Sequence, residues 1–299
     1  VTRGEWAMRT LDAWQPLFER LASSLSVPVD PDDEVSPDPA TELLGSLPQL
    51  MGTLLFGMQS GTMVGQLAQR TMGQYDLPIP RPTSDHLMVV PATVDGFAAD
   101  WSLPLDDVRL WVCVTELTLH AVLSRPHVRE RLQQLLLDYA GAFQPDNSAL
   151  ENRLNELDPT HPEQMAEMFD VTAVLGDIES EAQRDLRPQL EALTAVIVGY
   201  ADWIVDVVGR RLITSYPQLA EAFRRRRVEE TESDRFVERL LGLRLDQAQY
   251  DRGAAFIRGV LERAGDEGLS RLWRSAHELP TPAEVSAPGL WLARIDLPD

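Results

Sequence analysis

An acidic side chain in the middle of a very apolar segment is the first feature of this sequence that could do chemistry. The segment LDDVRLWVCVTELTLHAVL, residues 105–123, has apolar side chains all round a helical circumference, so we expect a helix that is buried on most sides. Glu116 lies near its centre, where an isolated ionised carboxylate is strongly disfavoured. This residue therefore needs a partner, a metal ion or a proton.

Three further residues could share a site with Glu116. His120 follows it by four positions, and Asp202 and Asp206 are four apart in a second apolar helix, predicted at residues 182–212. Three carboxylates and an imidazole could hold a divalent metal that prefers oxygen ligands. Such pairs also arise by chance in an acidic chain, so we prefer a Glu116 that is protonated or hydrogen-bonded to Thr, Tyr or Arg.

The composition limits the classes of partner. The chain carries 47 acidic and 27 basic residues, all of the latter Arg, and its formal charge is −20. This charge argues against nucleic acid and anionic membranes as partners, since both are polyanions. The N-terminal residues lack the apolar core of a secretion signal, and we expect a cytoplasmic protein. The single cysteine, Cys113, excludes an internal disulfide and is expected to be an inert, buried thiol.

Apolar periodicity predicts a largely helical chain. The segment HLMVVPATV, residues 86–94, is the best strand candidate, and Pro91 would confine it to a sheet edge or a bulge. We therefore predict a predominantly helical α+β protein with a small few-stranded sheet. Helices are expected at residues 4–25, 41–73, 105–123, 126–143, 182–212, 233–241, 246–264 and 269–273.

Three local patterns refine this prediction. Gly57, Gly61 and Gly65 are four apart, which predicts a neighbouring helix at very close range. The run Arg224 to Arg227 is interpreted as a solvated face paired with Glu229 and Glu230, and not as a nucleic-acid patch. The end of the chain is expected to be irregular and anchored by Trp291 and Ile295.

No flexible linker divides the chain into two parts with separate hydrophobic cores, so we predict one domain over residues 1–299. It would carry an N-terminal helical extension, residues 1–40, and a C-terminal helical part, about residues 215–299.

Several segments, in this order, resemble a family of bacterial zincin-like proteins assigned as hydrolases or zinc-dependent metalloproteases. They are GMQSGTMVGQLAQRTMGQYDLPIP, MVVPATVDGFAADWSLPLDDVRLWV, TELTLHAVL, VGYADWIVD, LLGLRLDQAQYDRGAAFI and LPTPAEV. The resemblance covers about residues 57–294, and GQYDLP and DDVRLWV are its most specific parts. It implies a zincin-like core for the single domain.

In that family, the central helix carries HExxH: two His ligands hold zinc and the Glu activates the metal-bound water. The resemblance places Thr115 and Leu119 at the two His positions, Glu116 at the Glu, and Val198 at a later acidic ligand. Glu116 would be the remnant base, and no cofactor is expected here although the family uses zinc. His120 substitutes poorly, because a residue five positions on is rotated about 140° from the first ligand position.

The resemblance thus implies a catalytically degenerate homologue, retained as a binding or regulatory protein for an unknown protein or peptide ligand. His120, Tyr200, Asp202 and Asp206 are candidate pocket residues. The alternative is a hydrolase or peptidase with a rebuilt metal site made of Glu116, His120, Asp202 and Asp206. A third, purely structural possibility is a partner that uses an exposed apolar groove.

Overall fold

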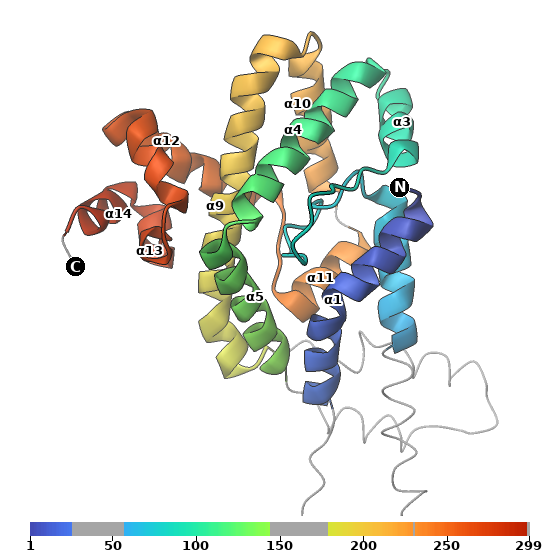
Figure 1. The fold of residues 1–299 in the computed structure, drawn as a ribbon, viewed down its shortest axis with the longest axis horizontal. Coiled ribbons are helices and arrows are strands. Elements are labelled where there is room, and N and C mark those ends of the chain that lie inside the picture. The colour runs from blue at the N-terminus through green and yellow to red at the C-terminus, as the bar shows by residue number, and fades with distance from the viewer. Residues whose placement is uncertain (26–56, 144–178, 230, 298–299) are drawn as a thin grey trace, which may run out of the picture.

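The computed structural model of this protein describes residues 1–25, 57–143, 179–229 and 231–297, and they form an assembly of helices (Figure 1). A further helical segment covers residues 57–70. The other helices are α1 (Arg3–Leu25), α3 (Pro91–Asp100), α4 (Leu105–Leu123), α5 (Pro126–Gly141), α9 (Glu181–Leu212), α10 (Tyr216–Val228), α11 (Glu232–Leu241), α12 (Gln247–Ser270), α13 (Pro282–Ser286) and α14 (Pro288–Ile295), with 3-10 turns η1 (Arg271–Trp273) and η2 (Ala276–Glu278). The prediction of a predominantly helical chain is confirmed.

The expected small sheet does not occur in the part of the chain that the structure describes. An isolated antiparallel bridge joins Gly73 to Val89, and the Val90 N–H donates to the Met72 carbonyl at 2.8 Å. The strand predicted at residues 86–94 is wrong because α3 begins at Pro91. Proline suits the first turn of a helix, where its missing N–H would have no intrahelical partner.

The long helix α9 forms the centre of the fold and packs against α4, α5 and α12. Ser180 begins it with a capping box, in which its hydroxyl accepts from the Gln183 N–H and the Gln183 side chain accepts from the Ser180 N–H. By length and composition α9 could cross a membrane, but 61% of its most apolar stretch is buried inside the fold. It is placed here as a core helix, as its sequence pattern predicts.

Helices α9 and α12 cross at very close range. A Cβ added to Gly253 would stand 1.9 Å from the carbonyl oxygen of Ala195, and one added to Gly199 would stand 2.4 Å from the backbone of Gly253. The prediction of close packing at Gly57, Gly61 and Gly65 is wrong, because a Cβ at each would meet nothing within 4 Å.

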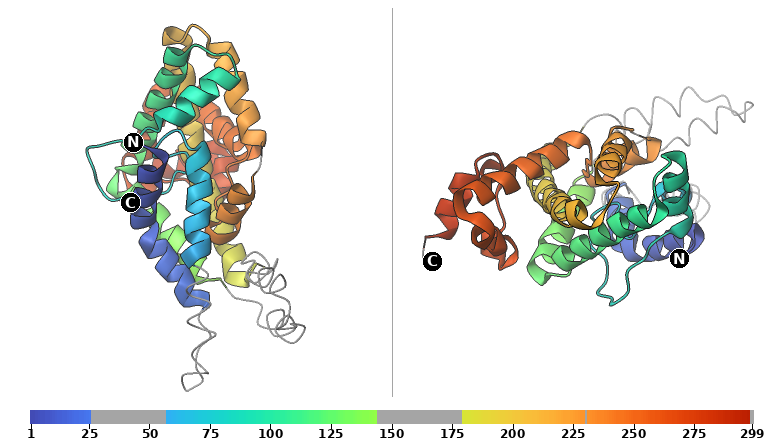
Figure 2. Two further views of the ribbon diagram at one scale, coloured as in Figure 1. Left: turned by 90° about the vertical axis from the view of Figure 1, so that its right-hand side faces the viewer. Right: turned by 90° about the horizontal axis from the view of Figure 1, so that it is seen from above.

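One apolar core runs through most of the molecule, and a smaller cluster lies beside it. The main core includes Trp6 and Trp14 of α1 as well as Trp291 and Ile295 of α14, the last two as expected. The C-terminal end is not irregular: its prolines open the short helices α13 and α14. The two termini lie toward opposite ends of the molecule's long axis, as the right-hand view of Figure 2 shows.

The smaller cluster packs α3, α4 and α10 together through aromatic rings. Trp111 stacks on Phe223 with ring centroids 4.9 Å apart. Helix α4 is less buried than predicted: Cys113 and Leu117 on its outer face are exposed. The prediction of a buried thiol is therefore wrong, because α4 packs on one side only. Residues 26–40 of the predicted N-terminal extension and residues 41–56 of the helix predicted at 41–73 lie outside the described residues.

Candidate functional site

Glu116 is buried in α4 and holds a segment that lies far away in the sequence. Its side chain is 3% exposed. Oε2 accepts the N–H groups of Gln74 and Tyr75 at 2.9 and 3.0 Å, and Oε1 lies 3.1 Å from the Tyr75 nitrogen. The carboxyl group therefore ties residues 74–75 to α4. Its partners are main-chain amides and not the Thr, Tyr or Arg side chains that the sequence suggested.

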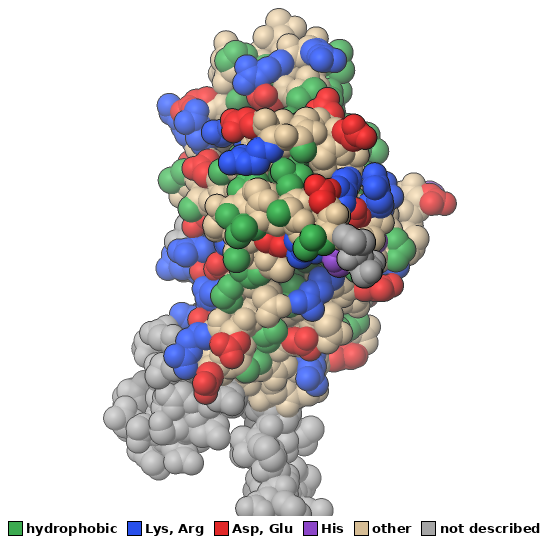
Figure 3. All heavy atoms as spheres, turned by 90° about the vertical axis from the view of Figure 1, so that its left-hand side faces the viewer, with side chains coloured by type: hydrophobic (Ala, Val, Ile, Leu, Met, Phe, Trp, Pro, Cys, Tyr) green, Lys and Arg blue, Asp and Glu red, His purple; other side chains and the backbone are tan. Residues whose placement is uncertain are grey.

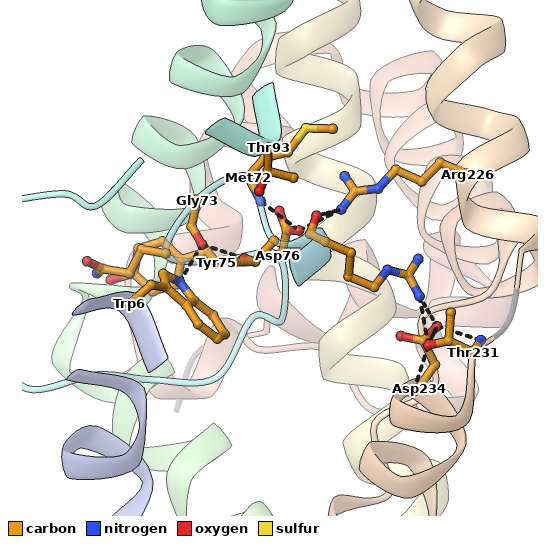
Figure 4. A network of polar contacts seen from close by, with 12 residues as sticks. Trp6, Met72, Gly73, Tyr75, Asp76, Thr93, Arg226, Thr231 and Asp234 are labelled. Carbon is orange, nitrogen blue, oxygen red and sulfur yellow. Dashed lines mark hydrogen bonds and ion pairs between the residues drawn. The ribbon is translucent and has the colours of Figure 1, made fainter. Parts of the chain in front are cut away.

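Gly73 is required by this contact. A Cβ at this position would stand 2.3 Å from the Glu116 carboxyl carbon, so a larger residue would push the carboxyl group away. The Gly73 carbonyl in turn accepts the Trp6 indole N–H at 2.8 Å and the Thr71 hydroxyl at 2.9 Å. Helix α1, residues 71–75 and α4 are thus joined by one set of hydrogen bonds, part of which is shown in Figure 4.

Burial raises the pKa of Glu116 to about 8, and the negative charge of Asp76 acts in the same direction. The hydrogen bonds from Tyr75 and Gln74 and the positive charge of Arg81 lower this pKa, but they do not overcome the burial. The raised pKa favours the protonated form of Glu116, and a protonated carboxyl group cannot act as a general base.

Glu116 lines a pocket of about 460 Å³, together with the three residues at the predicted ligand positions. Thr115 and Leu119 reach it from α4, and Val198 reaches it from α9. The positions that the resemblance assigned to three zinc ligands therefore face one cavity, although one of them lies about 80 residues away in the sequence. Further lining residues come from segment 71–78, α10 and residues 243–250.

Of the other candidate residues, Asp202 lines this pocket, whereas His120, Tyr200 and Asp206 do not. His120 is not among the pocket residues; its Nδ1 lies 3.1 Å from the Tyr75 hydroxyl. Tyr200 packs against Trp203 and Trp273 and lies outside the lining as well.

The two aspartates of α9 are engaged in ion pairs. Asp202 lines the pocket and pairs with Arg227 at 2.5 Å, whereas Asp206, outside the lining, binds Arg210 and the Tyr216 hydroxyl. Within residues 1–25, 57–143, 179–229 and 231–297, no group of three or more His, Cys, Asp and Glu side chains could hold a metal ion. The alternative set of Glu116, His120, Asp202 and Asp206 is therefore not assembled by this fold.

Ion pairs at the pocket were missed by sequence reasoning. Among the described residues, Arg226 and Arg227 pair with acids of other segments: Arg226 binds Asp76 at 2.8 Å and Arg227 binds Asp202. Glu230, one of the expected partners, lies outside the described residues. Arg224 and Arg225 do pair along α10, but with the preceding Glu221. Figure 4 shows the ion pair between Arg226 and Asp76. Near it lies the ion pair between Asp234 of α11 and Arg70 at the end of helix 57–70. The Asp in GQYDLP was visible in the sequence, but its partner is 150 residues away.

Comparison with known proteins decides the family. A family model described as zincin-like metallopeptidase matches residues 1–292. The chain belongs to this family. It is also similar to the crystal structure of a proposed hydrolase with a novel fold from Chloroflexus aurantiacus, at 27% sequence identity and a TM-score of 0.63, over 100% of this chain and 80% of that chain. A comparison with curated proteins found no match.

The zinc ion that the zincin-like family implies does not fit the side chains at these positions. The Thr115 hydroxyl donates to the Trp111 carbonyl at 2.9 Å within its own helix, and Leu119 and Val198 have no donor atom. Zinc sites in proteins are built from Cys, His and carboxylate ligands. Thr115, Leu119 and Val198 therefore do not supply the zinc ligands that the family pattern places at these positions.

Proposed function

We propose that this chain is a zincin-like homologue that has lost its zinc ligands and acts as a binding or regulatory protein for a protein or peptide ligand. One observation carries the proposal. Residues 115, 119 and 198 face the same pocket as Glu116, as the family pattern requires of ligands, but they are Thr, Leu and Val. A pocket that keeps its shape without a reactive centre is suited to binding.

The contacts of Glu116 support this proposal. A carboxylate that activates a metal-bound water must be ionised before it takes a proton. Here burial raises the pKa of Glu116 to about 8, which favours the protonated form, and the hydrogen bonds of the group are made to main-chain N–H groups. The hydrogen bonds to residues 74–75 explain why a glutamate is useful at this position without catalysis.

Charge and cysteine chemistry favour the cell interior and a protein or peptide ligand. The formal charge of −20 would repel nucleic acid and anionic membrane surfaces. Cys113 is an exposed free thiol, which persists most readily in a reducing compartment. We therefore propose a cytoplasmic protein that binds neither nucleic acid nor membrane.

Restoring the zinc ligands tests the proposal. The purified wild-type protein should contain far less than one zinc per chain by plasma mass spectrometry. The triple variant Thr115→His, Leu119→His and Val198→Glu should take up one zinc per chain, because the three side chains then face one pocket with competent ligands.

A matched control places the same His pair elsewhere on α4. The variant Cys113→His with Leu117→His has the same spacing on the exposed face, without the pocket or a third ligand, and should hold zinc only weakly. One tightly bound zinc in the wild-type protein would contradict the loss of the metal site. A folded triple variant that takes up no zinc would contradict the assignment of residues 115, 119 and 198.

A further inference from the structure

The charged side chains around the pocket are unbalanced in favour of acid. Each of the four lining arginines already pairs with a carboxylate: Arg70 with Asp234, Arg226 with Asp76, Arg227 with Asp202 and Arg244 with Asp246. Three more acids line the pocket, namely Glu116, Glu229 and Glu238. An anionic ligand would therefore find no arginine without a carboxylate partner among the described lining residues.

The buried lining of the pocket is largely apolar, with Glu116 and Thr71 as its polar side chains. Val112, Leu119, Val198, Ala201 and Val205 are buried there, and the rings of Trp111 and Phe223 adjoin them. Among the described lining residues that are buried, Glu116 alone carries a carboxyl group. It makes no ion pair with Arg81, the cation that lowers its pKa. A ligand that reaches the buried lining thus meets mostly hydrocarbon and aromatic rings, with one carboxyl group.

Glu116 retains capacity for another donor. A carboxylate offers about four acceptor positions on its two oxygens. The contacts at 2.9 and 3.0 Å are made to Oε2, and Oε1 has a single, longer one at 3.1 Å. An N–H donor from a ligand could bind at Oε1 without displacing the main chain.

We propose that this pocket binds an organic cation, an alkylammonium or guanidinium group on an apolar stem, with its charged end against Glu116. The inference rests on the proposed function, because a cavity without zinc leaves Glu116 accessible to a ligand. Burial favours the protonated form of Glu116, and a cation bound beside it would favour the ionised carboxylate instead, because it supplies the partner that the buried surroundings lack. The apolar walls accommodate the stem, and a volume of about 460 Å³ lies within the range of small-molecule sites. The same chemistry is offered by a free amine and by a Lys or Arg side chain of a peptide.

Three five-carbon probes that differ in charge test the proposal. Binding of n-pentylamine, n-pentanol and pentanoate to the full chain is measured by calorimetry and ligand-observed NMR at low ionic strength. Pentylamine should bind about tenfold or more tightly than pentanol, since a hydrogen bond to a charged group is stronger than a neutral one. Pentanoate should bind most weakly. Equal or tighter binding of pentanol or pentanoate would overturn the proposal.

Variants locate the binding. Glu116→Gln should weaken pentylamine binding about tenfold and leave pentanol binding unchanged. Glu262→Gln, the same change at an exposed position of α12, should alter neither. Thr115→Arg places a cation of the chain itself in the pocket and should abolish pentylamine binding, which keeps the test valid if Glu116→Gln does not fold. Pentylamine affinity that is unchanged in folded Glu116→Gln and in Thr115→Arg would contradict the proposed site.

A last arm separates the two sources of the cation. Binding of N-acetyl-lysine methylamide more tightly than pentylamine would support a peptide source, and weaker binding would support a free amine. Zinc content is measured on the same preparation. A zinc-free protein that binds no amine would remove this inference alone, whereas stoichiometric zinc would remove the proposed function.

Discussion

Glu116 connects two distant parts of the chain through its carboxyl group. We propose that it stands at the glutamate of the family's zinc-binding motif, and its oxygen atoms accept hydrogen bonds from Gln74 and Tyr75. Gly73 leaves just enough space for the carboxyl group. Substitutions of Glu116 should therefore change the free energy of unfolding, and the size of the change should depend on pH.

Because burial raises the pKa of Glu116 to about 8, the folded protein binds this proton more tightly than the unfolded chain does. Its contribution to the free energy of unfolding is fully present below the unfolded pKa, near 4.5, and is lost as the pH rises through 8. Glu116→Gln mimics the protonated form and should remove this loss. Relative to the wild type, the variant should gain roughly 3–5 kcal/mol between pH 5 and pH 9.

Urea unfolding across this pH range measures the difference, and Glu262→Gln on the surface of α12 serves as the control. Parallel pH profiles for the wild type and Glu116→Gln would show that the pKa of this carboxyl group is not raised by folding.

At the scale of elements, the crossing of α9 and α12 positions one wall of the pocket. Val198 and Ala201 line the pocket from α9 on either side of Gly199, whose backbone contacts Gly253 of α12. Residues 243–250, which lead into α12, line the pocket as well. The distance between these two helices therefore affects the cavity directly.

Gly253→Ala should destabilise the protein by more than about 3 kcal/mol, because its Cβ would overlap a main-chain carbonyl that cannot move alone. Thermal and urea unfolding provide the measurement. Gly61→Ala is the matched control: its Cβ would meet nothing within 4 Å, and alanine favours the helix by up to about 1 kcal/mol. Equal effects of the two substitutions would contradict the close crossing.

At the scale of the molecule, charge is spread over the surface and α1 is built into the core. Figure 3 shows one face on which Arg and acidic side chains alternate. Helix α1 contributes Trp6, Trp14, Leu17 and Leu21 to the main core, and Trp6 also lines the pocket. We propose that residues 1–299 form a single folding unit and that α1 is an integral part of it.

Arg81 holds α1 in place without an acidic partner among the described residues. Its guanidinium lies over the rings of Trp6 and Trp14, at 5.6 and 5.8 Å from their centroids, and it donates to the Thr10 hydroxyl at 2.7 Å. Such stacking favours the planar guanidinium over an ammonium group.

Arg81→Lys should therefore lower the free energy of unfolding by about 1–3 kcal/mol, measured by urea denaturation with tryptophan fluorescence. Arg9→Lys, on the exposed side of α1, should change it by less than about 0.5 kcal/mol. If the fluorescence of Trp6 and Trp14 changed in a separate transition at lower urea concentration, α1 would be a dispensable extension.

The sequence by itself determined most of the long helices, the buried acid and the family. Apolar spacing of three and four residues is a local property, so the limits of α1, α5 and α9 could be predicted to within one or two residues. The position of Glu116 in an apolar helix was enough to predict its burial, which the structure confirms. The sequence alone also shows that residues 115, 119 and 198 are Thr, Leu and Val.

Only the tertiary structure decided what surrounds these residues. Whether residues 86–94 form a strand depends on a pairing partner, and Pro91 instead begins a helix. Contacts between Glu116 and residues 74–75, between Asp76 and Arg226, and between Gly199 and Gly253 join positions more than 40 residues apart. Residue spacing carries no information about such distant pairs, because the packing of whole helices brings them together. The joining of α4 and α9 around one pocket is a property of that packing.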